Sequence, residues 1–191
     1  DYARAVPWVR QMGHSGEHVI LAVAGPDAVT IRGPRLIAVD TTHRGRWTTA
    51  AGASVDSVLS WGPSWKDAPS AFDVEAALER TREWWAAWAD RVQSAGTHAA
   101  LVTRSLMVLR ALTHSETGGI VAAATTSLPE AFGGSRNWDY RYVWLRDAAL
   151  TLSAYIDHGY LDVAQHWRTW LLRAIAGDPA DVQIMYGIAG E

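Results

Sequence analysis

Hydrophobic and polar positions divide the chain into a part that predicts strands and a part that predicts helices. Up to about residue 68, short apolar segments alternate with turns that contain Gly or Pro, and the segments at 19–24, 35–39, 47–49 and 55–60 are predicted strands. Such a series of short strands is typical of a β-sandwich. We interpret residues 1–68 as part of one, with its N-terminal strands absent.

Residues 69–96 are predicted to form a linker helix. Breaker residues at 62–70 mark a boundary, Asp73 is the expected N-cap, and Gly96 ends the pattern. One apolar stripe recurs at steps of four and three residues, through Val74, Leu78, Thr81, Trp85, Trp88 and Val92. Together with Trp84, this stripe indicates a docking face between domains rather than a platform for a sugar ring.

Residues 97–191 carry the periodicity of three more helices. The first is expected from an N-cap at Thr97 to Glu116, the second at 145–158 and the third at 162–176. The second is apolar on nearly every side, which predicts a buried helix, whereas the third has one apolar face and should lie outside it. This order is typical of an α/α barrel with alternating inner and outer helices, and it also fits a plain helical bundle. Only part of such a barrel would be present, so much apolar surface should stay uncovered.

Composition excludes several classes of function. The net charge of −3 comes from interspersed acids and bases, so neither nucleic acid nor a membrane is an expected partner. The chain has no Cys, which excludes thiol nucleophiles and Cys-ligated zinc, and we expect no cofactor. The 11 Trp against 2 Phe suit a packed core and also the C–H face of a sugar ring. Because the chain starts at Asp1 without Met, we expect a piece of a longer protein. A cytoplasmic location is a separate expectation.

The densest group of polar and aromatic residues is 137–147, directly before the apolar helix. Arg146 and Asp147 lie at the mouth of that helix, where a charge is costly unless it is paired or meets a polar ligand. A pyranose would use such charges for its hydroxyls and the aromatic faces for its ring. The same two residues would equally suit an ion pair that caps the helix. Asp139 and Asp147 are also candidates for the two carboxylates of a glycosidase, at a separation that the sequence does not give.

Two ordered motifs carry a resemblance to a known family. The first comprises ATTSLPE at 124–130, GG at 133–134, RNWDYRY at 136–142 and WLRDA at 144–148, and the second comprises QIMYGI at 183–188 with GE at 190–191. Both are similar to signatures of bacterial glycoside hydrolase family 15, the glucoamylases and trehalases. The β region and the Trp-rich helix also resemble this family. The resemblance implies the C-terminal part of a β-supersandwich, a linker helix and the first helices of an (α/α)6 barrel.

The family resemblance also implies an activity and a division of roles. The enzyme would hydrolyse α-glucosidic bonds from the non-reducing end with inversion, on an α-glucan, an oligosaccharide or trehalose. By resemblance, Arg146 and Asp147 grip hydroxyls of the terminal glucose, Tyr140 lies close under the sugar, and Trp144 lines the same pocket. The two catalytic glutamates of the family match nothing here and are expected after Glu191, so this chain by itself should be inactive.

Weaker signals and two rival functions complete the sequence interpretation. His14 and His18 have a metal-ligand spacing for a helix, but Gly13 and Gly16 argue against a helix there, and no metal site is expected. One rival is a disaccharide phosphorylase of similar architecture, which would yield glucose 1-phosphate rather than free glucose. The other is a carbohydrate-binding fragment without activity.

Overall fold

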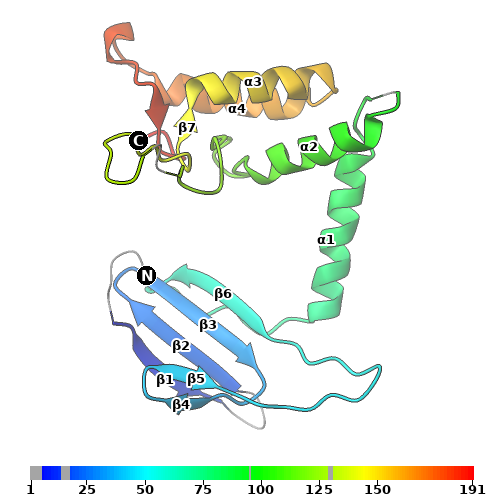
Figure 1. Ribbon diagram of the computed structural model, residues 1–191, viewed down its shortest axis with the longest axis vertical. Coiled ribbons are helices and arrows are strands. Elements are labelled where there is room, and N and C mark those ends of the chain that lie inside the picture. Colours follow the sequence, from blue (N-terminus) through cyan, green and yellow to red (C-terminus); the bar gives the residue numbers. More distant parts are fainter. Residues whose placement is uncertain (1–5, 14–17, 95, 129–130) are drawn as a thin grey trace. The chain divides into compact units, whose positions relative to one another are not determined.

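A computed structural model describes residues 6–13, 18–94, 96–128 and 131–191, and it contains antiparallel sheets followed by helices (Figure 1). The chain forms two compact units, Asp1–Thr81 and Arg82–Glu191, which are treated separately below. A mixed β and α composition is therefore confirmed. The division into a β-supersandwich part at 1–68, a linker helix at 69–96 and an (α/α)6 barrel part at 97–191 stays a prediction.

The first unit is built on a four-stranded antiparallel sheet in the order β1-β2-β3-β6, with a separate β4-β5 hairpin. The strands are β1 Trp8–Met12, β2 His18–Ala24, β3 Asp27–Gly33, β4 Ile37–Val39, β5 Thr42–Arg44 and β6 Val58–Pro63. Ile20 pairs with Ile31 at the centre of β2 and β3, and Val19, Ile20 and Thr30 are buried. β1, at the sheet edge, is exposed along its whole length.

The predicted strands agree with this sheet only in part. The segment at 19–24 is confirmed as β2, and the segments at 35–39 and 55–60 overlap β4 and β6. The strand at 47–49 is wrong, because these residues have neither strand nor helix conformation. β1, β3 and β5 are additional strands that complete the pairing on both sides of β2 and in the β4-β5 hairpin.

The predicted linker helix is α1, Val74–Ala89. Asp73 is its N-cap, as expected, since its carboxylate accepts a hydrogen bond of 3.0 Å from the Ala76 N–H. At the other end of α1, Trp88 stacks on Tyr160 at 4.3 Å between ring centroids, and the Tyr160 hydroxyl donates to the Trp88 carbonyl at 2.6 Å. The Trp88 end of the stripe therefore packs into the core of the second unit.

Besides the end of α1, the described residues of the second unit form three helices and a short two-stranded ladder. These elements are α2 Ala99–Ala111, β7 Val143–Trp144, α3 Leu145–Asp157, α4 Leu161–Ala174, the 3-10 turn η1 Pro179–Asp181 and β8 Met185–Tyr186. Its core joins all the helices through Trp88, Leu106, Ile120, Val143, Ala148, Tyr155, Tyr160, Trp167, Trp170 and Tyr186. None of the helices in the described part of the chain has the length and apolar character that a membrane span requires.

The expected first barrel helix is shorter at both ends than the sequence predicts. Its N-cap is His98 rather than Thr97, and no side chain caps it. The helix ends at Ala111, because Thr113 instead forms an antiparallel bridge with Ile120. Glu116 consequently lies in the intervening turn.

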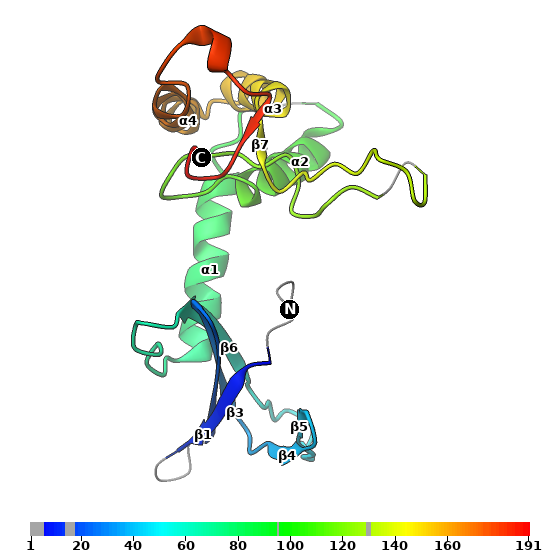
Figure 2. The same cartoon turned by 90° about the vertical axis from the view of Figure 1, so that its left-hand side faces the viewer.

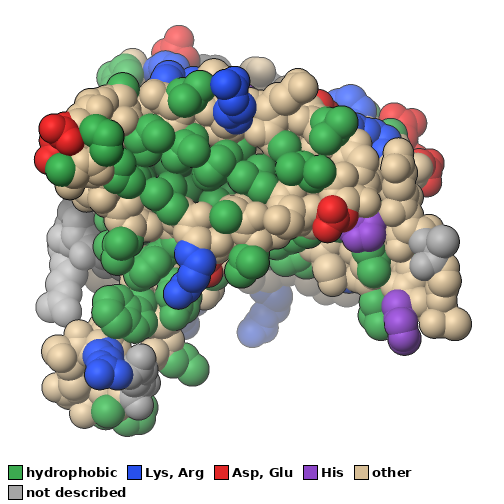
Figure 3. Space-filling view, turned by 90° about the horizontal axis from the view of Figure 1, so that it is seen from above, with side chains coloured by type: hydrophobic (Ala, Val, Ile, Leu, Met, Phe, Trp, Pro, Cys, Tyr) green, Lys and Arg blue, Asp and Glu red, His purple; other side chains and the backbone are tan. Residues whose placement is uncertain are grey.

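The expected second barrel helix, α3, begins where predicted and ends at Asp157, one residue early, but it does not have the predicted burial. Ala148 and Tyr155 are buried, whereas Leu150 and Ile156 are 69% and 50% exposed. The described residues of this unit provide no element against this face. The burial expected on nearly every side is therefore wrong, and the expected uncovered apolar surface is present. Figure 3, which looks onto the helical unit, shows hydrophobic side chains gathered on one of its faces.

The expected third barrel helix, α4, agrees with the prediction of one apolar face. Trp167 and Trp170 are buried, and Val163, Leu171 and Ala174 are partly buried against the core. The inner and outer placement of α3 and α4 in a barrel stays a prediction.

Candidate functional site

The first family-like motif folds back on itself as two antiparallel segments. The Ala123 N–H donates to the Tyr140 carbonyl at 2.8 Å, and the Ser127 N–H donates to the Trp138 carbonyl at 2.9 Å. The Ser127 hydroxyl in turn accepts from the Trp138 N–H at 2.9 Å. Figure 2 shows this segment extending from the helices of its unit. Pro129 and Glu130 of the motif lie outside the described residues.

The second motif pairs directly with the end of the first. In the β7-β8 ladder, Val143 lies opposite Tyr186 and Trp144 lies opposite Met185. The second motif is also fixed to α4, because the Trp170 indole N–H donates to the Ile188 carbonyl at 2.9 Å. Two segments about 40 residues apart along the chain therefore form one structural unit at the start of α3.

Tyr140 and Trp144, two of the four residues expected to bind sugar, are in contact. Their ring centroids lie 5.9 Å apart at an interplanar angle of 68°. Trp138 meets the same Trp144 ring edge-on at 6.2 Å and is 42% exposed. Trp138, Tyr140 and Trp144 form an accessible aromatic group, of which only Trp138 is absent from the expected site residues. The sequence signal that could have added Trp138 to the expected site residues is its spacing of two from Tyr140, because residues i and i+2 of an extended segment share a face.

Arg146 and Asp147, the other two expected residues, form an ion pair in the first turn of α3. Arg146 Nη2 lies 3.1 Å from Asp147 Oδ2, and the two side chains are 76% and 35% exposed. A carboxylate is favoured at this end of a helix by the helix dipole. The N-cap residue of α3 is Trp144, and no side chain forms a capping hydrogen bond there. Among the described residues, the hydrogen-bond partner of Asp147 is Arg146. The ion pair is thus present, while its outer surface stays open to solvent.

The ion pair and the aromatic group are close because they are almost contiguous. Trp144 is the last residue of β7 and the N-cap of α3, so Arg146 and Asp147 follow within one helical turn, about 5.4 Å along the axis. The Leu145 N–H donates to the Ile184 carbonyl at 3.1 Å, which fixes the junction to the second motif. Aromatic faces and charged hydrogen-bonding groups are therefore presented by one strand-to-helix junction.

Asp139 has a different environment from Asp147. Arg141 binds its carboxylate with two side-chain bonds, Nε to Oδ1 at 3.0 Å and Nη2 to Oδ2 at 2.7 Å, and the Arg141 backbone N–H also donates to Oδ1 at 3.0 Å. These hydrogen bonds hold the pKa of Asp139 below its usual range. A general acid needs a raised pKa, so this environment argues against Asp139 as the acid of a carboxylate pair. Arg141 is not among the expected site residues.

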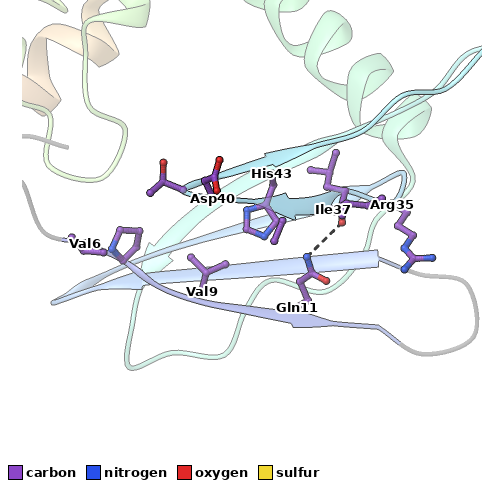
Figure 4. A pocket seen from close by; sticks show the side chains of 11 residues that line it. Val6, Val9, Gln11, Arg35, Ile37, Asp40 and His43 are labelled. Carbon is purple, nitrogen blue, oxygen red and sulfur yellow. Dashed lines mark hydrogen bonds between the residues drawn. The ribbon is translucent and has the colours of Figure 1, made fainter.

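Two other features of the described residues are weaker candidates. No group of three or more His, Asp or Glu side chains that could hold a metal ion occurs in the described ranges; His18 lies at the start of β2 and His14 lies outside those ranges. A hollow of about 660 Å³ in the first unit is lined by β1 and the β4-β5 hairpin (Figure 4). Among the described residues, Asp40 is the one acidic residue that lines the hollow, so these residues do not supply the paired carboxylates of a glycosidase.

Comparison with known proteins agrees with the two motifs. A family model described as glycosyl hydrolases family 15 matches residues 96–191. The trehalase of Mycolicibacterium smegmatis is 34% identical over 202 residues, which cover 100% of this chain and 30% of that protein. The trehalase of Thermoplasma acidophilum is 42% identical over 92 residues, which cover 48% of this chain and 16% of that protein.

The similarity extends to a third named relative. Trehalase 1 of Sulfolobus acidocaldarius is 36% identical over 119 residues, which cover 62% of this chain and 20% of that protein. The chain thus spans less than a third of the length of these relatives. No solved structure matches the chain significantly. The match of the family model to half of the chain, together with relatives along its full length, means that this chain belongs to glycosyl hydrolase family 15.

Proposed function

We propose that the protein to which this chain belongs is an inverting glycoside hydrolase that releases glucose from an α-glucoside, with α,α-trehalose as its substrate. The observation that carries the proposal is the junction of β7 and α3, where Tyr140, Trp144, Arg146 and Asp147 lie together in the first family motif. The names of the relatives, all trehalases, favour trehalose over a longer glucan.

In this proposal, the junction holds the glucose that is to be released. Tyr140 and Trp144 provide apolar ring faces for the C–H groups of the sugar. The Asp147 carboxylate accepts hydrogen bonds from sugar hydroxyls, and Arg146 donates to their oxygens. Hydrogen bonds to charged groups are worth about 1.5–3 kcal/mol each. In this proposal, Tyr140 and the negative charge of Asp147 also stabilise the developing oxocarbenium ion.

Inversion needs two further carboxyl groups. One protonates the leaving oxygen, and the other activates a water molecule on the opposite face of the sugar, at a separation of roughly 6.5–9.5 Å. Asp139 is engaged by Arg141 and Asp147 is assigned to binding. The family resemblance implies that the general acid and general base are two glutamates after Glu191. The present chain then supplies the sugar-holding half of the pocket.

Product analysis with the full-length protein tests this function. Trehalose, maltooligosaccharides and isomaltose are each incubated with the enzyme, and the anomers released are followed by proton NMR before mutarotation. Attack of water with inversion on trehalose gives one β-glucose from the attacked ring and one α-glucose from the leaving ring. We expect equal early yields of both anomers from trehalose, and slower or no release from the other sugars.

The same assay separates the alternatives. Early release of α-glucose alone from trehalose would contradict inversion. Glucose 1-phosphate formed only when inorganic phosphate is added would identify a phosphorylase. Sugar binding without any product would identify a carbohydrate-binding protein, and either of these two results would overturn the proposed hydrolase.

A further inference from the structure

The ion pair of Asp139 and Arg141 closes a turn around Tyr140. Its three hydrogen bonds join the Asp139 carboxylate to both the side chain and the backbone of Arg141. Building on the proposed function, we propose that Asp139 and Arg141 are positioning residues, which hold Tyr140 and Trp144 in the arrangement that receives the sugar ring without contacting the sugar themselves.

Asp139 connects the turn to Trp144 through its backbone. The Trp144 indole N–H donates to the Asp139 carbonyl at 2.9 Å, while the carboxylate of the same residue is held by Arg141. One residue thus fixes the indole ring of Trp144 and, through the turn, the backbone of Tyr140. The relative placement of the two aromatic rings depends on Asp139 at both points.

Tyr140 is held by its backbone and keeps its side chain for a ligand. Its carbonyl accepts from the Ala123 N–H at 2.8 Å, and the Thr126–Asp139 bridge fixes the preceding residue. Among the described residues its hydroxyl has no hydrogen-bond partner, and its ring contacts Trp144. A tyrosine whose main chain is fixed from both sides and whose hydroxyl is unpaired is well prepared to meet a polar substrate.

The cost of losing this ion pair should fall on the site rather than on the fold. Exposed ion pairs contribute little to stability, and Arg141 is 46% exposed. The preorganisation of the binding residues, by contrast, is sensitive to small displacements. When these side chains are misplaced, the reaction rate falls although the protein stays folded. Removal of the pair should therefore separate activity from stability.

The chain contains a matched control pair in the same unit. Arg91 Nη2 lies 2.7 Å from Asp162 Oδ1, the same distance as in the Arg141–Asp139 pair, and Arg91 is also 46% exposed. Arg91 lies over the ring of Tyr160 and takes no part in either family motif. The Asp162 carboxylate is more exposed than that of Asp139, at 61% against 28%, and it accepts one hydrogen bond from Arg91. Asp162→Asn therefore reports what the loss of a more exposed ion pair does to this fold.

The test compares Asp139→Asn, Arg141→Lys and Asp162→Asn in the full-length protein, by kcat and KM on trehalose and by melting temperature. We expect Asp139→Asn and Arg141→Lys to lower kcat by about tenfold or more, with a smaller change in KM, because the transition state depends most on placement. Their melting temperatures should match that of Asp162→Asn, whose kcat should stay within about twofold of the wild type.

A double-mutant cycle with Tyr140→Ala distinguishes an effect of Asp139 that acts through Tyr140 from a general effect on the structure. If Asp139 acts through Tyr140, Asp139→Asn should have little further effect on kcat in the Tyr140→Ala background. Two results would overturn the inference: additive effects of the two substitutions on kcat, or a kcat for Asp139→Asn within about twofold of the wild type. In either case, hydrolysis by the wild type would leave the proposed function intact. A wild-type protein that releases no glucose would overturn the function, and the inference with it.

Discussion

At the scale of single residues, the hydroxyls of Tyr155 and Thr113 form a buried polar contact within the helical core. The two oxygens lie 3.0 Å apart, and Tyr155 has no exposed surface. Burial raises the pKa of Tyr155 to about 12, against a smaller opposing effect of the hydrogen bond with Thr113. The folded chain therefore prefers the neutral phenol.

This preference predicts a loss of stability in alkali. Unfolded tyrosine loses its proton near pH 10, so the stabilisation is fully present below that pH and is lost as the pH rises through the folded pKa of about 12. The free energy of unfolding should fall by up to about 2–3 kcal/mol over this interval through Tyr155 alone. Urea unfolding at pH 8, 10 and 11.5 measures it, with Tyr155→Phe as the comparison. A variant with the same pH slope as the wild type would contradict the assignment.

Single residues also mark where sequence interpretation stops. The sequence alone does not distinguish Asp139 from Asp147, because both are carboxylates near one apolar helix. Their partners distinguish them, because Asp139 is held by three hydrogen bonds from Arg141, whereas Asp147 has one from Arg146. Such partner choice depends on the turn geometry at Tyr140, which residue spacing alone does not determine.

At the scale of secondary structure, local signals predict the helices well and the strands poorly. The Asp73 cap and the apolar periodicity place α1, and the glycine at 159 with a positive φ of 90° ends α3 where the sequence predicts it. β1 and β3 are extended because they pair with β2, and the local sequence pattern does not predict which strands pair. For the same reason α2 is predicted too long, since the Thr113–Ile120 bridge ends it.

The attachment of the second motif to α4 can be tested at Gly119. A Cβ atom there would lie 2.8 Å from the Ile188 carbonyl oxygen and 3.2 Å from Trp170 Nε1, the two atoms that share a hydrogen bond. Gly119→Ala should therefore destabilise the helical unit by about 1–3 kcal/mol. Urea unfolding followed by the Trp170 indole NMR signal measures this change.

Gly62→Ala is the matched control for this substitution. A Cβ atom at Gly62, in β6, would meet no atom within 4 Å, so that variant should be about as stable as the wild type. If Gly119→Ala left the Trp170 signal and the unfolding midpoint as unchanged as Gly62→Ala does, the described docking of the second motif would be wrong.

At the scale of the whole molecule, the helical unit has a continuous core but leaves apolar side chains of one helix uncovered. Its helical core is continuous from Trp88 to Tyr186, yet α3 leaves Leu150 and Ile156 exposed. The relatives are more than three times as long, so the remainder of such a protein is available to cover this face. On our proposal, the same remainder brings the catalytic carboxylates to the junction of β7 and α3.

The family was accessible from sequence, through the motifs at 124–148 and 183–191, and the sugar-holding role of the first motif stays a proposal. The direct pairing of the two motifs in the β7-β8 ladder was not accessible from sequence, because they lie far apart along the chain. The ladder forms the base of the candidate site, where Trp144 is both the last residue of β7 and the N-cap position of α3.

The most direct test of the sugar-holding role is the kcat/KM of Asp147→Asn for trehalose, measured in the full-length protein beside Asp162→Asn. Loss of a charged hydrogen bond to the bound glucose should lower kcat/KM by about 10- to 100-fold or more. The control should stay within about twofold of the wild type, since the Arg91–Asp162 pair is exposed and outside both motifs. A kcat/KM for Asp147→Asn equal to that of the wild type would remove Asp147 from the site and contradict the account.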